Sequence, residues 1–439
     1  MFKTIANAFQ DKGVRKKLLI TLLLLLVYRI GCWIPIPLLN QKFFEEMGNN
    51  SFLSLLSAVS GGSLANGAIL ALGVSPYITS SIIIQLLTIA IPGLERLSKE
   101  GGVEGRKKIN FYTRIIALVL SIAQALGIVL AFAGSSEEAL YVSASAYDLG
   151  IFGQKWFIEV LAVIMLVAGG MFTVWLGERI TDLQIGNGMS LLIFVGILST
   201  AGTAFLNACG KVTGSFESIW PIILFLIVLL LIFTFIVWLD LSERRVPVQY
   251  AKQIKGRKMY GGQGAPLPIK VNGNGVMPII FANAILTFPQ LLSSVFGWGE
   301  WYTQPWWTYT SIILTALFIF LFAFFWSQIT FNTEDVSKNL QQHGGFIQGI
   351  RPGKPTAEYL GRILKYITFF GAFCLALIAF VPSIAFNIIG GVDIGMGGNT
   401  SLINAFSATG LMIVVSVALE FDKQLNAQLT MKNYKGFLK

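Results

Sequence analysis

The stretch from Lys16 to Pro37, KKLLITLLLLLVYRIGCWIPIP, places two lysines before an apolar run that continues to the end of the stretch. A helix of about 20 apolar residues crosses a hydrocarbon core of about 30 Å. The run is longer than the apolar part of a secretion signal, and no small-residue cleavage site follows it. We therefore interpret 18–37 as a membrane span that the protein retains.

Nine further apolar runs repeat this pattern along the chain. The chain is 54% hydrophobic and 12% charged, whereas a soluble domain is about 25% charged. This composition excludes a string of soluble domains and predicts an all-α polytopic membrane protein. The ten expected transmembrane helices are 18–37, 70–91, 110–132, 156–176, 188–208, 219–239, 276–296, 309–331, 361–385 and 402–419.

The ten expected spans divide into an N-terminal half, 1–208, and a C-terminal half, 209–439, with five spans in each. This parity permits an inverted repeat with a site near the membrane midplane, as in many transporters. No sequence similarity between the halves is visible, so the parity permits such symmetry without requiring it. An even number of spans also places both termini on the same side of the membrane.

Positive charge is confined almost entirely to one side of the expected spans. All but four of the 32 Lys and Arg lie in or beside every second gap, and the exceptions are Arg29, Lys42, Lys155 and Lys211. Because basic loops remain cytoplasmic, this side, with both termini and the large loops 240–275 and 332–360, is expected to face the cytoplasm. The net charge of +10 suits a face that meets anionic lipid, RNA or an acidic partner.

Several kinds of chemistry find little support in the sequence. Cys32, Cys209 and Cys374 are scattered and lack CxxC spacing, and His343 is the only histidine. This pattern argues against a disulfide framework, a metal site and a histidine proton relay. The expected spans contain no paired carboxylates and no nucleophile with an obvious base, so an intramembrane protease or another enzyme is not favoured. We expect no cofactor.

The segment 51–66, SFLSLLSAVSGGSLAN, departs from the pattern of long apolar runs. It is too short to span a membrane, and Gly61 and Gly62 end its helical apolar face. A re-entrant segment sheltered by protein or a water-filled cavity would fit, and so would an external interfacial helix. The apolar face consists of Phe52, Leu53, Leu55, Leu56 and Val59.

Two pairs of apolar residues recur at a spacing of four residues near the start of expected spans. Val74 and Ile78 open the second span, and Met189 and Ile193 open the fifth. Residues four apart lie on one face of a helix. Ordinary helix packing explains any such pair, so the spacing by itself gives little support to a role in a pore.

Five longer strings resemble the SecY family, the channel subunits of the bacterial protein-conducting translocon. They are YRIGCWIPIP (28–37), SGGSLANGAILALGVSPYITSSIIIQLLT (60–88), EGRKKINFYTR (104–114), WLGERITDLQIGNGMSLLIF (175–194) and GIRPGKPTAEYL (349–360). The resemblance extends over almost the whole chain. It implies two pseudo-symmetric halves of five helices around an hourglass-shaped pore, closed from outside by a plug at about 51–66.

The resemblance also implies a ring of apolar side chains at the waist of the pore. A narrow apolar neck offers water and ions no replacement for their hydration, so it resists leakage. Met189 departs from the usual β-branched residue, although a flexible thioether can fill an irregular gap. The placement of Ile413 depends on the start of the tenth span, because the preceding loop, 386–404, is longer and richer in glycine than is usual in the family. The implied ring is Val74, Ile78, Met189, Ile193, Ile280 and Ile413.

In the family a lateral gate opens between the second and third spans on one side and the seventh and eighth on the other. Gln85, Gln124 and Asn283 lie on these spans and are candidates for hydrogen bonds across a closed gate. Such contacts are worth about 0.6–2 kcal/mol each in a membrane, so a hydrophobic signal sequence can displace them. Each residue would serve equally well in ordinary hydrogen bonds between helices anywhere in the bundle.

The family's large cytoplasmic loops receive the ribosome or the motor SecA, and Arg257, Lys258 and Arg351 match its basic positions there. The general bias of positive charge toward the cytoplasm explains most cations in these loops. It explains Arg351 less well, because the GIRPG turn would hold one arginine at a loop tip. Contacts to ribosomal RNA would be sensitive to salt.

The sequence thus predicts a passive channel in the bacterial cytoplasmic (inner) membrane. It would secrete unfolded polypeptides and insert hydrophobic segments laterally, driven by SecA or the translating ribosome. The alternative is a secondary transporter, which should carry ionisable residues near the midplane. Arg29 is the only clear charge within an apolar run, and it would also serve to anchor the first span to an internal partner. The implied partners are SecE, SecG, SecA, the ribosome with its RNA, signal sequences, nascent polypeptides and anionic lipid.

Overall fold

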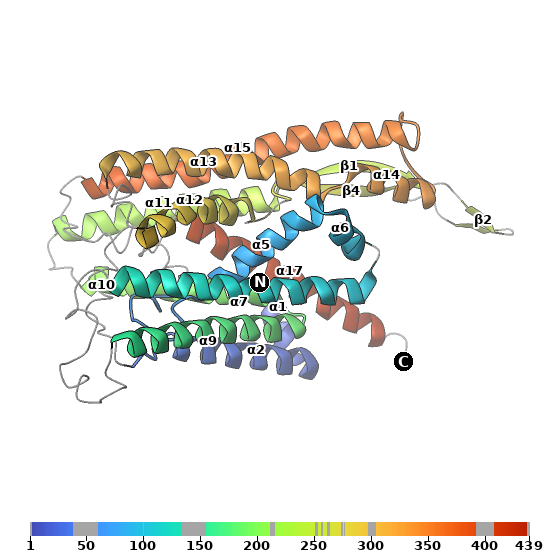
Figure 1. Ribbon diagram of the computed structural model, residues 1–439. Coiled ribbons are helices and arrows are strands. Elements are labelled where there is room, and N and C mark those ends of the chain that lie inside the picture. The colour runs from blue at the N-terminus through green and yellow to red at the C-terminus, as the bar shows by residue number, and fades with distance from the viewer. Residues whose placement is uncertain are drawn as a thin grey trace. The chain divides into compact units, whose positions relative to one another are not determined.

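Helices make up most of the computed structural model, which describes residues 2–37, 60–99, 101–133, 155–210, 216–250, 253–255, 258–260, 264–273, 275, 277–296, 304–391 and 408–436 (Figure 1). The helices are α1 (Phe2–Gln10), α2 (Lys12–Gly31), α5 (Ser75–Ala90), α6 (Pro92–Lys99), α7 (Gly102–Ala133), α9 (Lys155–Asp182), α10 (Gly188–Gly210), α11 (Phe216–Leu241), α12 (Met277–Phe296), α13 (Pro305–Thr330), α14 (Thr333–Gln342), α15 (Lys354–Gly391) and α17 (Ala408–Gly436).

Several helices are long and apolar enough to cross a membrane. Among the described residues there are five, which lie in α7, α9, α10, α13 and α15, and a sixth if α5 and α6, bent by 107°, count as one span. Many exposed side chains on these helices are apolar, as Ile164 on α9 (58% exposed) and Leu321 on α13 (53%) illustrate, and lipid is a suitable solvent for such surfaces. The prediction of a helical, polytopic membrane protein is confirmed, while the count of ten spans stays a prediction.

The chain forms two compact units. The first contains Met1–Ile222, Thr287–Trp307 and Ile389–Lys439, and the second contains Ile223–Leu286 and Thr308–Ile388. The expected division into halves at residue 208 stays a prediction.

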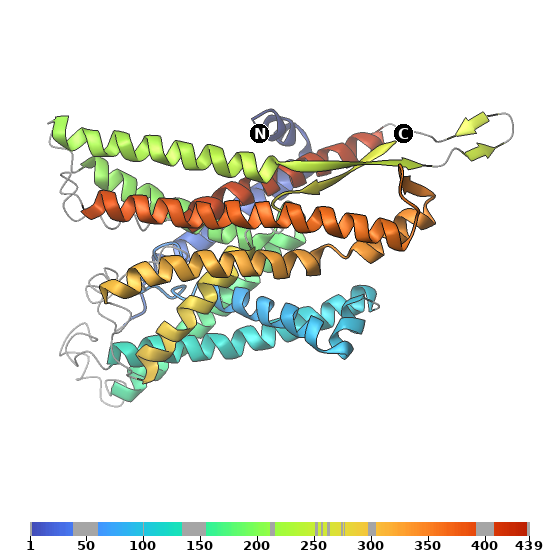
Figure 2. The same ribbon diagram turned by 90° about the horizontal axis from the view of Figure 1, so that it is seen from above.

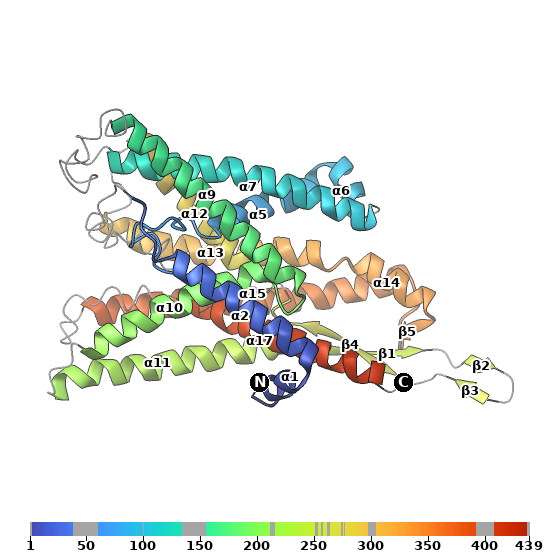
Figure 3. The ribbon, with the colours of Figure 1, turned by 90° about the horizontal axis from the view of Figure 1, so that it is seen from below.

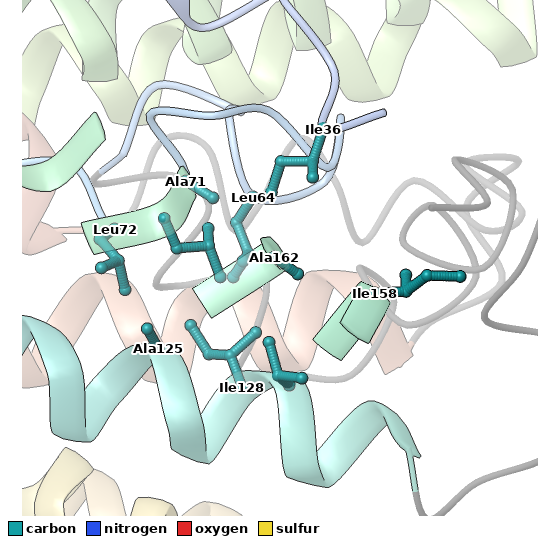
Figure 4. Packing of buried hydrophobic residues seen from close by; sticks show 10 residues of the cluster. Ile36, Leu64, Ala71, Leu72, Ala125, Ile128, Ile158 and Ala162 are labelled. Carbon is teal, nitrogen blue, oxygen red and sulfur yellow. The ribbon is translucent and has the colours of Figure 1, made fainter. Parts of the chain in front are cut away.

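In the first unit, α7 packs against α5 and α9, and α10 packs against α9 and α17. One apolar cluster gathers Leu64 and Leu72 from the segment before α5, Ala125 from α7, and Ala162 from α9 (Figure 4). A second cluster joins Ala8, Val14, Leu18, Ile185 and Leu425. Figure 3 shows the corresponding placement of α1 beside α2 and α17.

In the second unit, the two large loops predicted by the sequence contain β-strands. A three-stranded antiparallel sheet has the order β4 (Ala265–Lys270), β1 (Glu243–Tyr250), β5 (Gly345–Ile347), and β2 (Gln253–Lys255) pairs with β3 (Lys258–Tyr260). Figure 2 shows α11 leading directly into β1. The register pairs Val246 with Leu267 and Val248 with Ile347. The all-α expectation therefore omitted these strands.

A buried cluster beneath the sheet explains its register. Alternate residues in the middle of β1 point inward, so Val246 and Val248 are buried while Pro247 and Gln249 are exposed. This alternation is the pattern of a strand with one buried face. The cluster comprises Val246, Val248, Ile269, Leu340, Ile347 and Leu360.

Candidate functional site

The described part of the predicted re-entrant region begins at Ser60, and we call residues 60–74 the base segment. The apolar residues Phe52, Leu53, Leu55, Leu56 and Val59 lie outside the described residues. The base segment consists of turns, with positive φ at Gly61 (74°) and Gly62 (81°). Ser63 Oγ donates to the carbonyl oxygens of Ser60 (2.8 Å) and Leu70 (3.0 Å). These bonds fold the segment back on itself just before α5 begins.

Backbone hydrogen bonds join the residues that follow α2 to the base segment. The amide of Ile36 donates to the carbonyl oxygen of Gly67 at 2.9 Å, and the amide of Ile69 donates to that of Ile34 at 3.0 Å. Buried backbone groups need partners of this kind, because an unpaired one is costly away from water. Irregular backbone can therefore lie next to the spans at this point.

Side chains from the last turns of α2 hold two successive carbonyl groups of the base segment. Arg29 Nη1 donates to Gly61 O at 2.6 Å, and the Tyr28 hydroxyl donates to Ser60 O at 3.3 Å. The Cys32 thiol lies 3.9 Å from Ser60 O. The Arg29 guanidinium also lies 5.8 Å from the centroid of the Trp33 ring, within the range of a cation–π contact. Arg29 thus has the internal partner that the sequence analysis offered as an alternative to a coupling charge.

Helices α9 and α10 approach the base segment closely enough to require glycine. A Cβ atom added to Gly61 would lie 2.9 Å from the Cα of Gly196 on α10, and one added to Gly169 on α9 would overlap the carbonyl group of Ile69. The segment is therefore enclosed by α2, α9 and α10, with backbone next to backbone.

Most of the predicted ring residues are buried in the first unit. Val74 lies at the start of α5, one helical turn before Ile78, whose amide donates to Val74 O at 3.1 Å. Ile193 on α10 and Ile413 on α17 are buried, and these two helices pack against each other. Ile280 lies on α12 in the second unit and is partly buried.

Met189 is the ring candidate whose contacts are best defined. It is buried in the first turn of α10, and the Asn187 side chain accepts a hydrogen bond from its amide at 3.1 Å. A Cβ added to Gly177 on α9 would meet the Met189 thioether. The side chain therefore packs between α9 and α10.

The three gate candidates occupy partly buried positions on their helices. Gln85 on α5 donates from Nε2 to Ser81 Oγ at 3.5 Å, while its Oε1 is buried without a hydrogen-bond partner in the part of the chain that the structure describes. Gln124 lies on α7 and Asn283 on α12. The structure brings α5 and α7 together, and Asn283 belongs to the second unit.

Among the docking candidates, Arg351 lies in a turn that is held by well-defined hydrogen bonds. It is exposed in the turn formed by residues 349–353, which we call the Arg351 turn, and Gly349 and Gly353 have positive φ there. Thr356 Oγ1 donates to Arg351 O at 2.8 Å, and Ser337 Oγ donates to Gly353 O at 2.7 Å. The sequence analysis did not identify these two hydroxyl residues.

The other two docking candidates lie in or next to the β2–β3 hairpin. Lys258 begins β3, and Arg257 lies outside the described residues. As for metals, the described residues contain no group of three or more His, Cys, Asp and Glu that could hold an ion.

The fold and the base segment define a helical membrane protein with the architecture of protein-conducting channels. A solved structure of a protein-conducting channel matches with a TM-score of 0.64 at 19% identity, over 93% of this chain and 90% of that one. A SecY structure, described as having a plug domain that stabilises the closed state and maintains a membrane seal, matches with a TM-score of 0.62 at 20% identity, over 92% and 90%.

At the level of sequence, the model of the SecY family matches residues 68–421. Protein translocase subunit SecY of Streptomyces coelicolor is 41% identical over the whole of both chains. The Thermus thermophilus subunit of the same name is 36% identical over 100% of this chain and 98% of its own length. The chain belongs to the SecY family. The comparisons give no support to the secondary-transporter alternative.

Proposed function

We propose that the chain is the channel subunit of a bacterial Sec translocon, through which unfolded polypeptides cross the cytoplasmic membrane and hydrophobic segments enter it laterally. The observation that carries this proposal is the 41% identity to a protein translocase subunit over the full length of both chains. SecY is a channel subunit and not an enzyme, so the energy for transport comes from SecA or the translating ribosome.

The proposed architecture has ten spans in two pseudo-symmetric halves, 1–208 and 209–439, with both termini in the cytoplasm. We assign residues 51–66 as a plug, with the fixed turns of the base segment as support. Val74, Ile78, Met189, Ile193, Ile280 and Ile413 would form the apolar waist. A closed waist of this kind dewets and blocks ions, yet makes no fixed polar contact that would hold a passing chain.

Gln85, Gln124 and Asn283 are the proposed polar residues of the lateral gate. Among the residues that the structure describes, the buried Oε1 of Gln85 has no hydrogen-bond partner. This supports the role, because an unsatisfied polar atom costs free energy in the closed packing. A gate that contains such an atom needs less free energy to open than a gate in which every polar atom is hydrogen-bonded. The proposed membrane partners are SecE and SecG, together with signal sequences, nascent polypeptides and anionic lipid.

A crosslinking experiment tests the channel directly. With Cys32, Cys209 and Cys374 replaced by serine, a single cysteine at Ile193 is expected to form a disulfide with a cysteine in an arrested secretory chain. Leu198→Cys is the control, because Leu198 lies on the same helix but is 53% exposed, whereas Ile193 is buried. Crosslinking at position 198 but at neither 193 nor 78, in a loaded complex, would overturn the proposal.

Arg257, Lys258 and Arg351 are the proposed contacts for the ribosome, including its RNA, or for SecA. A solved Sec61 structure from a canine ribosome–channel complex matches this chain with a TM-score of 0.61 at 18% identity, over 93% of this chain and 90% of that one. The exposed Arg351, held by Thr356 and Ser337, supports a rigid point of contact. Hydrogen bonds between arginine and phosphate or carboxylate are the stronger, charge-assisted kind.

Arg351→Glu is expected to reduce export about tenfold or more, because reversing a charge at a preorganised contact replaces attraction by repulsion. Export of a model preprotein into inverted membrane vesicles measures the effect. Lys354→Glu is the matched control: it reverses an exposed charge three residues away, at the start of α15. An equal loss in both variants would indicate a general charge effect and would remove the special role of Arg351.

A further inference from the structure

We propose that residues 421–428 of α17 form a brace for the turn between α9 and α10, and that Gln428 is a positioning residue that keeps Met189 in place. This inference rests on the proposed position of Met189 in the apolar waist. It goes beyond that role, because it assigns a task to the part of α17 that follows the tenth expected span, 402–419.

The turn between the two helices has a backbone conformation that its own residues do not favour. Gln184 has a φ of 59°, and it is the single residue other than glycine with a positive φ in the part of the chain that the structure describes. The Cβ atom makes this left-handed conformation costly, so it persists where the surrounding structure holds it. The side chain of Gln184 is exposed, so the support has to reach this residue through its backbone.

One face of α17 lies along this turn and supplies that support. Gln428 Nε2 donates a hydrogen bond to the backbone carbonyl oxygen of Gln184. One and two helical turns earlier, Leu425 and Phe421 pack in the apolar cluster that contains Ile185. Residues at spacings of three and four share one face of a helix. The brace therefore meets the turn with one amide donor and two apolar side chains.

Short hydrogen bonds connect the turn to Met189 at the start of α10. Thr181 Oγ1 donates to Gly177 O at 2.9 Å and accepts from the amide of Gly188 at 2.9 Å, which ties the first residue of α10 to α9. The Asn187 side chain accepts from the amide of Met189 at 3.1 Å. A Cβ atom added to Gly188 would overlap the carbonyl group of Gly177. The first residues of α10 thus have little freedom while the turn is fixed.

Loss of the Gln428 hydrogen bond should therefore displace Met189. Without it, Gln184 gains free energy by leaving the left-handed conformation, and the first residues of α10 move with the turn. The Met189 thioether then loses its close fit beside Gly177 on α9. Because an apolar neck blocks ions only while it stays narrow, the expected consequence is an ion leak through the resting channel.

The test is a double-mutant cycle on the resting ion conductance of the reconstituted channel complex in planar lipid bilayers. The variants are Gln428→Met, which removes the donor but keeps a side chain of similar length, Gln184→Gly, and both together. Gln428→Met is expected to raise the conductance about threefold to tenfold, as the loss of one hydrogen bond implies. Gln184→Gly alone should leave it unchanged. In that background Gln428→Met should have no effect, because glycine adopts a positive φ readily.

The cycle separates a brace for this turn from a general stabilisation of the bundle by α17. An equal leak from Gln428→Met in both backgrounds would mean general stabilisation and would overturn the inference, and so would the absence of a leak. Gln424→Met is the matched control, because the Gln424 amide bonds to Glu420 of its own helix at 3.0 Å. It should leave the conductance unchanged, and a leak comparable to that of Gln428→Met would also overturn the brace.

A further variant, Met189→Ala, separates the inference from the function on which it rests. It is expected to raise the resting conductance, because a smaller side chain leaves a wider neck. A conductance unchanged by Met189→Ala overturns the place of Met189 in the waist, and the inference with it. A leak in Met189→Ala together with none in Gln428→Met overturns the brace alone.

A milder variant covers the case in which Gln428→Met fails to reach the membrane. Gln428→Asn keeps the amide but is one methylene shorter, so its donor is withdrawn from the carbonyl oxygen of Gln184. It is expected to raise the resting conductance by a smaller factor, and Gln184→Gly should remove this rise. Persistence of the rise in the Gln184→Gly background would overturn the inference.

Discussion

Replacing Gly169 with alanine is expected to lower the free energy of unfolding by about 1–3 kcal/mol or more, because added volume in a packed interior is costly when its neighbours cannot move. The new Cβ would overlap the carbonyl group of Ile69 in the base segment. That carbonyl belongs to a residue whose amide is bonded to Ile34 O, so it cannot shift freely. Thermal unfolding of the purified protein in detergent measures the change.

Gly170→Ala is the matched control on the same helix. The nearest atoms to a Cβ at this position would be 3.6 Å away, an ordinary contact distance. Since alanine favours a helix over glycine by about 1 kcal/mol, this variant should be neutral or slightly more stable. Equal unfolding temperatures for the two variants would contradict the close packing of α9 on the base segment.

The second large effect is expected in the second unit, where Leu360→Ala should destabilise the three-stranded sheet by about 2–5 kcal/mol, as loss of a buried leucine usually does. Leu360 is 0% exposed and packs in the cluster with Val246, Val248 and Ile347. Loosening this cluster should also release the Arg351 turn. Faster cleavage of the loops by an added protease, together with reduced export, is the expected result.

Tyr359→Ala is the control for this variant, because Tyr359 is the adjacent residue and is 37% exposed. It should change protease sensitivity and export much less. If Leu360→Ala leaves the cleavage rate unchanged, the cluster does not support the loops, and the assignment of a rigid docking surface loses its structural basis.

The sequence is sufficient to predict that the chain forms long apolar helices that can cross a membrane, but not the strands between them. Apolar runs longer than 20 residues have few alternatives to a helix in lipid. By contrast, β1 begins with charged residues and is interrupted by Pro247, a pattern that argues against a central strand. The register resolves this conflict, because β5 pairs only from Val248 onward, and Pro247 faces β4 alone. That arrangement depends on a pairing between residues about a hundred positions apart, which local patterns do not reveal.

In the candidate site, too, the sequence predicts local features but not the contacts between distant residues. The sequence marks Arg29 as an unusual charge, but its partner is Gly61, 32 residues away, and only the fold brings the two together. The spacing of Met189 and Ile193 predicts a shared face, yet it does not indicate that the Met189 thioether packs against Gly177. Short-range patterns define faces and charges, whereas contacts between backbone and backbone, as at Gly61 and Gly169, depend on the tertiary structure.

Helix α15 begins one residue beyond the Arg351 turn and continues without a break for 38 residues. At 1.5 Å per residue its length is about 57 Å, well beyond the roughly 30 Å of the hydrocarbon core. If the proposed partner binds at Arg351, the force that it applies acts on one end of a helix long enough to extend through the bilayer, so binding at this turn can tilt or rotate the helix along its length.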